Sequence, residues 1–289
     1  LKSPASPSCH LPPRSLNNRP PHFPNTPMSK NIESHLIEDR VFKPSKEFSK
    51  KARVSSMAQY RRMYKESIEK PSLFWAREAK ELHWQKPWKK VLEWKAPFAK
   101  WFTEAKLNVC ENCVDRHLSN GRKNKAAIIW EGEPGDKRVL TYHQLHREVC
   151  RFSNILEANG VKARDRVLIY MPMVPEAVVG MLACARLGAV HSVVFGGFAS
   201  KELATRIDDA KPDVILTASC GIEPTRVVEY MPLIDEALEL AEYPAKNCVV
   251  LQREHHRAQL QPVRDYDWNE ISQAAAPVSP VDVEATDPL

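Results

Sequence analysis

Long apolar runs and glycine-rich loops are both missing from this sequence, and each gap excludes a class of protein. No stretch of the 289 residues approaches the roughly 18 consecutive apolar residues that a membrane-spanning helix needs. The nine glycines are scattered, and none forms the GxxxxGK(S/T) pattern of a P-loop or the GxGxxG pattern of a dinucleotide-binding loop. The sequence therefore argues against a membrane protein and a dinucleotide-dependent oxidoreductase.

The sequence also lacks the pattern of a disulfide framework and a large excess of charge of one sign. The seven cysteines are scattered, most of them in apolar segments, which is typical of a reducing compartment, so we expect a cytoplasmic protein. Cys110 and Cys113 form a lone CxxC with His117 four residues on, but no second pair completes a metal site. The net charge of +6 is spread over segments that also hold many acids, so we expect no nucleic-acid and no membrane partner.

The first residues have no acidic side chain and no apolar core. Residues 1–27 hold eight prolines and three basic residues, so we expect residues 1–28 to be a disordered head. A secretory signal is excluded because no apolar segment is present. A transit peptide and translated upstream sequence both stay open. The second is favoured, because Met28 begins an ordinary start.

Residues 29–117 are polar, rich in lysine and aromatic in their second half. The aromatic anchors are Phe74, Trp75, Trp84, Trp88, Trp94 and Trp101. We interpret the segment as a helical N-terminal region that packs on the main domain, with helices near 56–68 and 72–82. Its tryptophans are interpreted as core or domain-packing residues. Binding of single-stranded nucleic acid is the alternative, which the packing-like spacing of the aromatic residues disfavours.

From residue 126 onward, expected strands alternate with expected helices. The apolar segments read as strands are 126–130, 166–171, 189–195, 213–217 and 247–251. Thr141 is expected to cap a helix, and residues 226–240 are expected to be largely helical. This alternation predicts the α/β class with a doubly wound, mainly parallel sheet.

The strand–helix–strand unit over 165–198 suggests where a site would lie. Gly188 is expected to end its helix in a left-handed cap, and Gly196 and Gly197 follow its second strand. Ligands of open parallel sheets collect at the carboxyl ends of the strands. Two interpretations remain open: the loop binds a ligand, or it is only a tight turn and Phe195 belongs to the core.

Five long segments resemble the AMP-forming acetyl-CoA synthetases. They are FWAREAKELHWQKPWKKVLEW (74–94), KWFTEAKLNVCENCVDRHL (100–118), WEGEPGDKRVLTYHQL (130–145), RVLIYMPMVPEAVVGMLACARLGAVHSVVFGGF (166–198) and RIDDAKPDVILTA (206–218). The resemblance covers about residues 30–289. It implies an acetyl-CoA synthetase N-terminal region over 29–117 and an incomplete AMP-binding synthetase domain over 118–289.

The resemblance also implies a two-step reaction. A short carboxylate attacks ATP in the presence of Mg²⁺ to give an acyl-adenylate and pyrophosphate, and the CoA thiol then displaces AMP. Acetate is the first substrate expected, and propionate is the second. In the family the phosphate loop and a catalytic lysine lie beyond the segment that ends at Leu289. We therefore expect no catalytic residue in this chain, with an inactive truncated binding module as an alternative.

Part of the CoA site is nevertheless implied within the chain. Its residues would be Phe195, Gly196, Gly197, Glu223, Pro224, Thr225 and Arg226. Phe195 would offer a ring face on which adenine can stack. Arg226 matches a basic residue that binds a CoA phosphate in the family. Glu223 stands where many family members have a second basic residue, and its carboxylate would repel phosphate. This segment also resembles relatives of the propionyl-CoA synthetase type.

Other conspicuous side chains are interpreted as structural. His191 is expected to be a satisfied core histidine, and the acidic pair Asp208 and Asp209 a solvated helix end. Cys184 and Cys220 are expected to be small buried residues with no activating base beside them.

Overall fold

A computed structural model describes residues 41–271 and 277–289. The head expected over residues 1–28 lies outside the described residues. The chain divides into two compact units, residues 1–56 and 57–289, and each is described by itself. None of the described helices is both long and apolar enough to cross a membrane.

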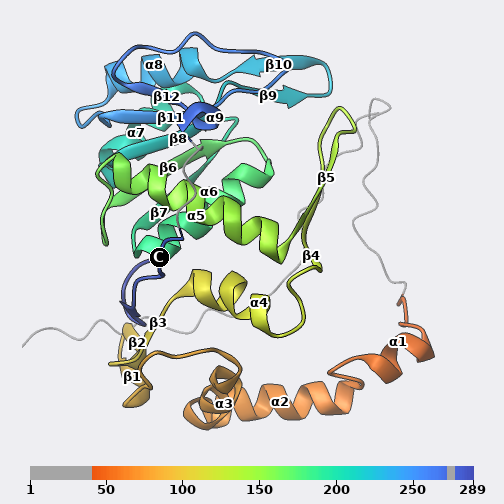
Figure 1. The fold of residues 1–289 in the computed structure, drawn as a ribbon. Coiled ribbons are helices and arrows are strands. Elements are labelled where there is room, and N and C mark those ends of the chain that lie inside the picture. The colour runs from red at the N-terminus through yellow and green to blue at the C-terminus, as the bar shows by residue number, and fades with distance from the viewer. Residues whose placement is uncertain (1–40, 272–276) are drawn as a thin grey trace, which may run out of the picture. The chain divides into compact units, whose positions relative to one another are not determined.

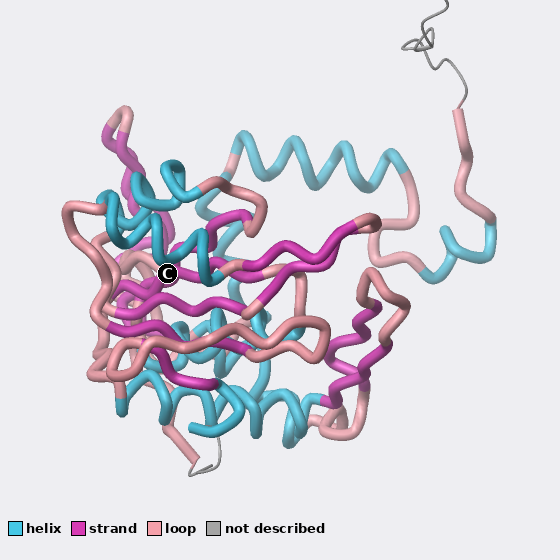
Figure 2. The backbone as a smooth tube through the Cα atoms, turned by 90° about the horizontal axis from the view of Figure 1, so that it is seen from above, coloured by secondary structure: helices cyan, strands magenta, loops and turns pink. Residues whose placement is uncertain are grey.

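A parallel sheet forms the centre of the second unit (Figure 1). Among the described residues it has five strands, in the order β12-β11-β8-β6-β7. These are β12 (Asp265–Asp267), β11 (Asn247–Leu251), β8 (Val214–Ala218), β6 (Arg166–Met171) and β7 (Val190–Phe195). Figure 2 shows the strands lying between helices on both sides. The expected α/β class with a doubly wound, mainly parallel sheet is confirmed.

The helices bury both faces of the sheet. They are α5 (Tyr142–Ala158), α6 (Pro175–Leu187), α7 (Ser200–Ala210) and α8 (Met231–Leu240). Successive side chains of a strand point to opposite faces, so Val167 and Ile169 of β6 join the core with α5 and α6. Leu168 and Tyr170 join the second core with α7 and α8. Burial on both faces explains why this strand reads as a continuous apolar run.

Local chemistry begins α5 and ends α6 where the sequence predicts. The Thr141 hydroxyl accepts from the Gln144 backbone N–H while the Gln144 side chain accepts from the Thr141 N–H, which is a capping box for α5. Ser45 caps the short helix α1 (Lys46–Lys51) of the first unit in a similar way. Gly188 follows α6 in the left-handed conformation, with φ +70°.

The N-terminal region is only partly helical, which corrects the expectation for residues 29–117. Its elements are α2 (Met57–Glu69), α3 (Pro71–Glu78), the 3-10 helix η1 (Ala79–Glu81), β1 (Lys90–Lys95), β2 (Phe98–Thr103), β3 (Lys106–Leu107), the π-helix η2 (Glu111–Asp115) and α4 (Arg116–Ser119). Strands β1 and β2 pair as an antiparallel hairpin that places Trp94 opposite Ala99 and Trp101 opposite Leu92. Aromatic and apolar residues on both sides of Pro97 favour strands, and the proline suits the turn between them.

The aromatic residues of this region pack mainly on one another. Trp84, Trp88 and Phe102 form a cluster with ring centroids 5.2–5.3 Å apart. Trp94 is 66% exposed. The core of the sheet instead receives Cys110 and Val114, both fully buried. The tryptophans therefore serve mainly as packing within the region, while Cys110 and Val114 make the contact with the sheet core.

The first expected strand of the sheet belongs to a separate hairpin. Strand β4 (Ala126–Glu131) pairs antiparallel with β5 (Lys137–Thr141), and the pair projects away from the sheet (Figure 1). The fifth strand of the sheet is β12 instead, which follows a long loop after β11. Strand β12 is only three residues long, with Tyr266 between two aspartates, so it has no apolar run by which the sequence could reveal it.

A second correction concerns residues 226–240. Strand β10 (Arg226–Glu229) pairs with β9 (Cys220–Glu223) in a hairpin, and α8 begins only at Met231. Pro232 in the first turn marks this start, because proline is tolerated there and not in a helix interior.

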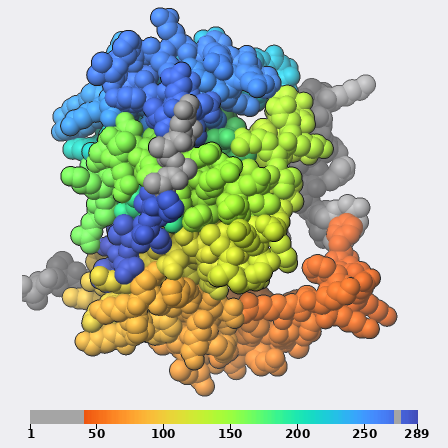
Figure 3. Space-filling view, viewed as in Figure 1, coloured from red at the N-terminus to blue at the C-terminus, as the bar shows by residue number. Residues whose placement is uncertain are grey.

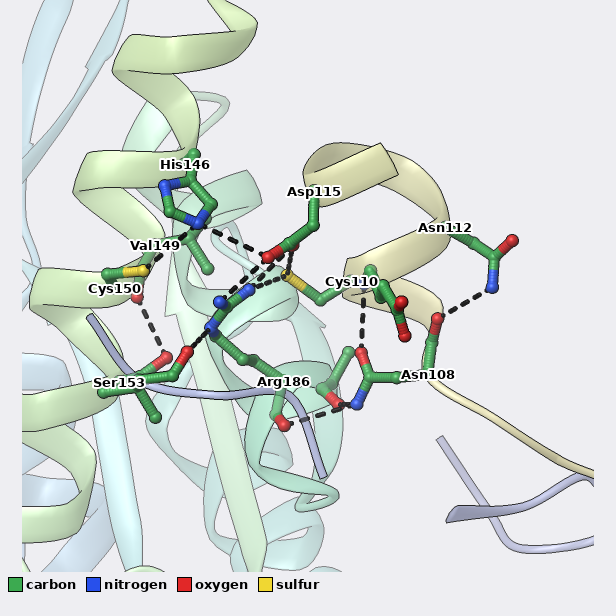
Figure 4. A network of polar contacts seen from close by, with 12 residues as sticks. Asn108, Cys110, Asn112, Asp115, His146, Val149, Cys150, Ser153 and Arg186 are labelled. Carbon is green, nitrogen blue, oxygen red and sulfur yellow. Dashed lines mark hydrogen bonds and ion pairs between the residues drawn. The ribbon is translucent and has the colours of Figure 1, made fainter. Parts of the chain in front are cut away.

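A buried ion-pair network joins the N-terminal region to the sheet domain (Figure 4). Arg186 at the end of α6 donates to both carboxylate oxygens of Asp115, at 2.8 and 2.9 Å. His146 of α5 lies 3.4 Å from the same carboxylate. Its Nε2 also lies 3.6 Å from the sulfur of Cys150. Since the Arg186 side chain is 3% exposed, this pairing offsets the cost of burying its charge.

The C-terminal residues fasten the same junction. Strand β13 (Val283–Glu284) pairs antiparallel with β3, and the buried Asn108 amide donates to the Val281 and Ala185 carbonyls at 2.8 Å each. In Figure 3 the dark blue C-terminal residues reach the yellow surface of the N-terminal region. Helix α9 (Trp268–Ile271) adds the Trp268 ring, which stacks on Phe152 at 3.7 Å.

Candidate functional site

The strand order places a natural ligand position at the carboxyl ends of β6 and β8. Counted along the chain, the order of the sheet is 2-1-3-4-5, and the direction of winding changes between β6 and β8. Loops that leave neighbouring strands in opposite directions open a crevice at such a point. The loops after β6, β7 and β8 all start at this edge, so the residues expected to bind CoA lie on it.

The loop after β7 is a tight turn with an exposed aromatic ring. The Phe198 backbone N–H donates to the Phe195 carbonyl at 3.1 Å, which closes the turn. Phe195 is 72% exposed, and its ring meets that of Phe198 edge-on at 5.9 Å. The tight turn is thus present, but the alternative that Phe195 belongs to the core is wrong.

The glycines of this turn are needed for space, not for backbone conformation. Neither Gly196 nor Gly197 has a positive φ. A Cβ on Gly197 would lie 2.6 Å from the ring of Phe195. A Cβ on Gly196 would collide with the hydroxyl of Tyr230, a residue that sequence reasoning placed inside a helix. The available signal was Pro232, which marks the true start of α8.

The β9–β10 hairpin carries the second group of expected residues. Pro224 and Thr225 form its exposed two-residue turn, flanked by the paired residues Glu223 and Arg226. Arg226 Nε donates to Glu223 Oε2 at 2.8 Å, and this hydrogen bond raises the pKa of Arg226. The Glu223 carboxylate, which was expected to repel phosphate, therefore also competes with phosphate for the Arg226 guanidinium. The base of this hairpin meets the β7 loop at Tyr230, because Gly221 also faces its hydroxyl.

Two hollows lie beside the β4–β5 hairpin and the loop after β6. A cavity of about 270 Å³ is lined by residues that include Trp130, Glu176 and Arg253, and one of about 250 Å³ is lined by Trp130, Ile222 and Arg253 among others. The Trp130 indole donates to the Met173 carbonyl at 2.7 Å, which holds the β4–β5 hairpin over the loop after β6. The sequence did not predict that the β4–β5 hairpin would line these cavities, since Trp130 was expected to belong to the central sheet.

The side chains interpreted as structural behave mostly as expected. Cys184 and Cys220 are fully buried, and burial raises the thiol pKa of both, to about 12 for Cys184. Asp208 accepts from the Tyr243 backbone N–H at 2.9 Å, and Asp209 is exposed. His191 is half-buried, and its Nδ1 has no partner among the described residues, so the expectation of a satisfied core histidine is wrong.

A metal or ATP-phosphate site does not fit the residues present. Within 41–271 and 277–289, no group of three or more His, Cys, Asp or Glu side chains could hold a metal ion. The sequence also has no glycine-rich phosphate loop of the P-loop type. No chemical step is therefore assigned to Mg²⁺ or to ATP phosphates on these residues.

Comparison with known families completes this description. Residues 115–289 match the family described as "AMP-binding enzyme". The chain belongs to this family. Residues 60–113 match the "Acetyl-coenzyme A synthetase N-terminus" family. The Asp115–Arg186 pair lies within the first match, and Arg186 also donates to the sulfur of Cys110, a residue of the second match, at 3.4 Å.

Curated relatives of this AMP-binding enzyme family member cover most of the chain. Acetyl-coenzyme A synthetase of Leptospira biflexa is 50% identical over 75% of this chain and 34% of its own length. That of Chlorobaculum tepidum is 40% identical over 90% of this chain and 40% of its own length. Human "Acyl-CoA synthetase short-chain family member 3, mitochondrial" is 44% identical over 81% and 34%. The chain thus spans about a third to two fifths of these relatives.

A solved structure supports the same fold. Acetoacetyl-CoA synthetase from Streptomyces lividans matches with a TM-score of 0.68 and 23% identity, over 76% of this chain and 34% of that one. The fold with its parallel sheet is therefore shared with a known structure.

Proposed function

We propose that this chain supplies the sheet scaffold and part of the CoA site of an AMP-forming acetate–CoA ligase. The overall reaction converts ATP, acetate and CoA into acetyl-CoA, AMP and pyrophosphate through acetyl-adenylate. The observation that carries the proposal is the pair of family matches over 60–113 and 115–289, which together span most of the described residues. Residues 29–117 would form the N-terminal region, and residues 118–289 part of the AMP-binding domain.

The proposed CoA site combines the two loops at the carboxyl edge of the sheet. Phe195 presents an exposed ring that suits stacking on adenine. Gly196 and Gly197 bring the backbone close to the ligand, and Pro224 and Thr225 form the neighbouring hairpin turn. Arg226 would bind a CoA phosphate once it leaves the Glu223 carboxylate.

The first test is acyl-dependent AMP release by the protein made from the complete reading frame that encodes this chain. We expect turnover with acetate, ATP, Mg²⁺ and CoA, and no ATP–pyrophosphate exchange by the 289-residue chain alone, since it carries no phosphate loop of its own. Folded full-length protein without turnover on any short carboxylate would reject the proposal. Exchange by the short chain would show that it holds an adenylation site after all.

A second test uses opposite changes at the hairpin turn. Arg226→Ala should raise the KM for CoA about tenfold or more, because a charge-assisted contact contributes roughly 1.5–3 kcal/mol. Glu223→Gln should lower it, because the amide releases the guanidinium. Steady-state kinetics with CoA, acetate and ATP varied in turn would measure both. Equal changes in all three KM values would point to a folding role.

Propionate is the second candidate substrate. The Glu223–Arg226 segment resembles propionyl-CoA synthetase relatives, and a relative at 44% identity is named as a short-chain acyl-CoA synthetase. The ratio of kcat/KM for acetate and propionate would decide between them. We propose a cytoplasmic location, which fractionation of cells expressing the full-length protein would test.

A further inference from the structure

Tyr230 lies where the two proposed CoA-binding loops meet. It directly precedes α8 and is 5% exposed. A Cβ built on Gly196 would collide with its hydroxyl oxygen. A Cβ built on Gly221 would lie 2.7 Å from the same oxygen and 2.9 Å from ring carbon Cε1. One hydroxyl therefore fills the space that two glycines on different loops leave open.

Backbone conformation gives no other reason for these glycines. Gly196 and Gly221 have no positive φ, so an alanine would be free of backbone strain at either position. The closest steric contact of a side chain at either position is with Tyr230, and at Gly196 the Met171 carbonyl oxygen would also lie 3.0 Å away. Gly197 differs, because its Cβ would meet the Phe195 ring and not Tyr230.

The tyrosine is held so that it cannot retreat from the glycines. Its backbone N–H donates to the Ser219 carbonyl at 3.1 Å. Its ring packs on that of Tyr170 with centroids 5.0 Å apart, and the Tyr170 hydroxyl donates to the Phe198 carbonyl at 2.8 Å. The turn after β7 thus contacts Tyr230 at Gly196 and Tyr170 at Phe198. The Tyr230 hydroxyl itself makes no hydrogen bond within the described part of the chain, so its contact with the loops is one of shape.

We propose that Tyr230 is a positioning residue for CoA. Its hydroxyl spaces the turn at Gly196 from the base of the β9–β10 hairpin, and so sets where Phe195 meets the ligand. This inference rests on the proposed CoA site, but the spacing itself can be tested without any ligand.

The spacing is tested by chemical unfolding of the full-length protein. Gly196→Ala should lower the midpoint, and Tyr230→Phe in the same chain should recover at least half of that loss. Recovery is expected because Tyr230→Phe removes the closest contact of the new methyl group. Its nearest remaining neighbours are the Met171 carbonyl oxygen at 3.0 Å and the ring of residue 230 at 3.1 Å. A double variant no more stable than Gly196→Ala would overturn the spacing role.

Two matched controls make the recovery specific. Gly197→Ala should not be rescued by Tyr230→Phe, because its clash is with Phe195. Gly221→Ala should be rescued only in part, because the hydroxyl is removed but the ring carbon at 2.9 Å remains. Equal rescue of all three glycine variants would mean that Phe at 230 stabilises the chain in general, which also overturns the proposal.

The positioning role is tested by kinetics of the full-length protein. Tyr230→Phe should raise the KM for CoA two- to fivefold, and Gly196→Ala at least tenfold, while the KM values for ATP and acetate change less than twofold. The double variant should lie closer to wild type than Gly196→Ala. Coupling in stability without a selective effect on CoA would reject positioning. Failure of the CoA site as a whole is recognised separately, because Arg226→Ala would then also leave the KM for CoA unchanged.

Discussion

Asp115 shows at the scale of one residue how a junction between segments is held. Burial alone would raise its pKa, but hydrogen bonds from His146 and Arg186 more than offset this and hold the pKa at about 2. The hydrogen bond to Asp115, and a further one with Cys150, raise the pKa of His146 to about 9. The imidazole is therefore charged in the folded chain at neutral pH, whereas in the unfolded chain it would be largely neutral.

This predicts a stability that falls as the pH rises. Because the folded pKa of His146 exceeds the unfolded one, its contribution is complete below about pH 6.5 and is lost towards pH 9. The free energy of unfolding should fall by about 1–3 kcal/mol over this range relative to His146→Gln. Urea unfolding at several pH values would measure it, and parallel curves for the two proteins would contradict it.

The comparison needs one control at the neighbouring thiol. Burial raises the pKa of Cys150, but its hydrogen bond with His146 lowers it overall, which would add a slope of opposite sign. Both proteins should therefore carry Cys150→Ser, which removes the thiol titration and leaves the larger effect of Asp115 on His146.

At the scale of elements, the end of α6 depends on what packs against it. Gly188 has φ +70°, and a Cβ there would lie 2.9 Å from Val283 of β13. Gly160, which follows α5, has φ +85° but no atom within 4 Å of such a Cβ. The two glycines thus share a backbone requirement and differ in crowding.

Alanine at these two positions should separate the two effects. Gly160→Ala should cost about 1–2 kcal/mol, from the left-handed backbone alone. Gly188→Ala should cost more, because β13 must also move away from β3. Unfolding free energies of the two variants would provide the test. Equal losses would mean that the C-terminal residues give way without cost.

At the scale of the whole second unit, β7 is an exposed edge of the sheet as described. It pairs with β6 alone, and Val193 and Phe195 on its outer positions are 57% and 72% exposed. Unpaired edges with apolar side chains favour association with other chains. The 289-residue chain should therefore aggregate at micromolar concentration.

A single charge on this edge should reduce that association. Val193→Lys should lower light scattering of the 289-residue chain at equal concentration, with little change in its unfolding midpoint, because the side chain already faces solvent. Thr205→Lys, on the exposed side of α7, adds the same charge away from the edge and should leave scattering higher. Equal scattering by both variants would show that the chains do not associate through the β7 edge.

The sequence by itself determined the parts of the fold that depend on neighbouring residues. The run over β6, the capping box at Thr141 and the left-handed glycine after α6 were all read from short windows, since propensity and capping act over a few residues. The resemblance also placed Phe195 at the end of β7 and Arg226 in a turn after β8, although Arg226 is the first residue of β10.

Only the tertiary structure decided what those loops contact. Nothing in the sequence separates β4 from the sheet, pairs Glu223 with Arg226, or brings Tyr230 between Gly196 and Gly221. These arrangements depend on which strand lies beside which, and a strand pairing joins residues far apart in the chain. The physical reason is that steric and ionic contacts at the sheet edge form between side chains of different loops. The local sequence predicts the conformation of each loop but not which side chain of another loop lies beside it.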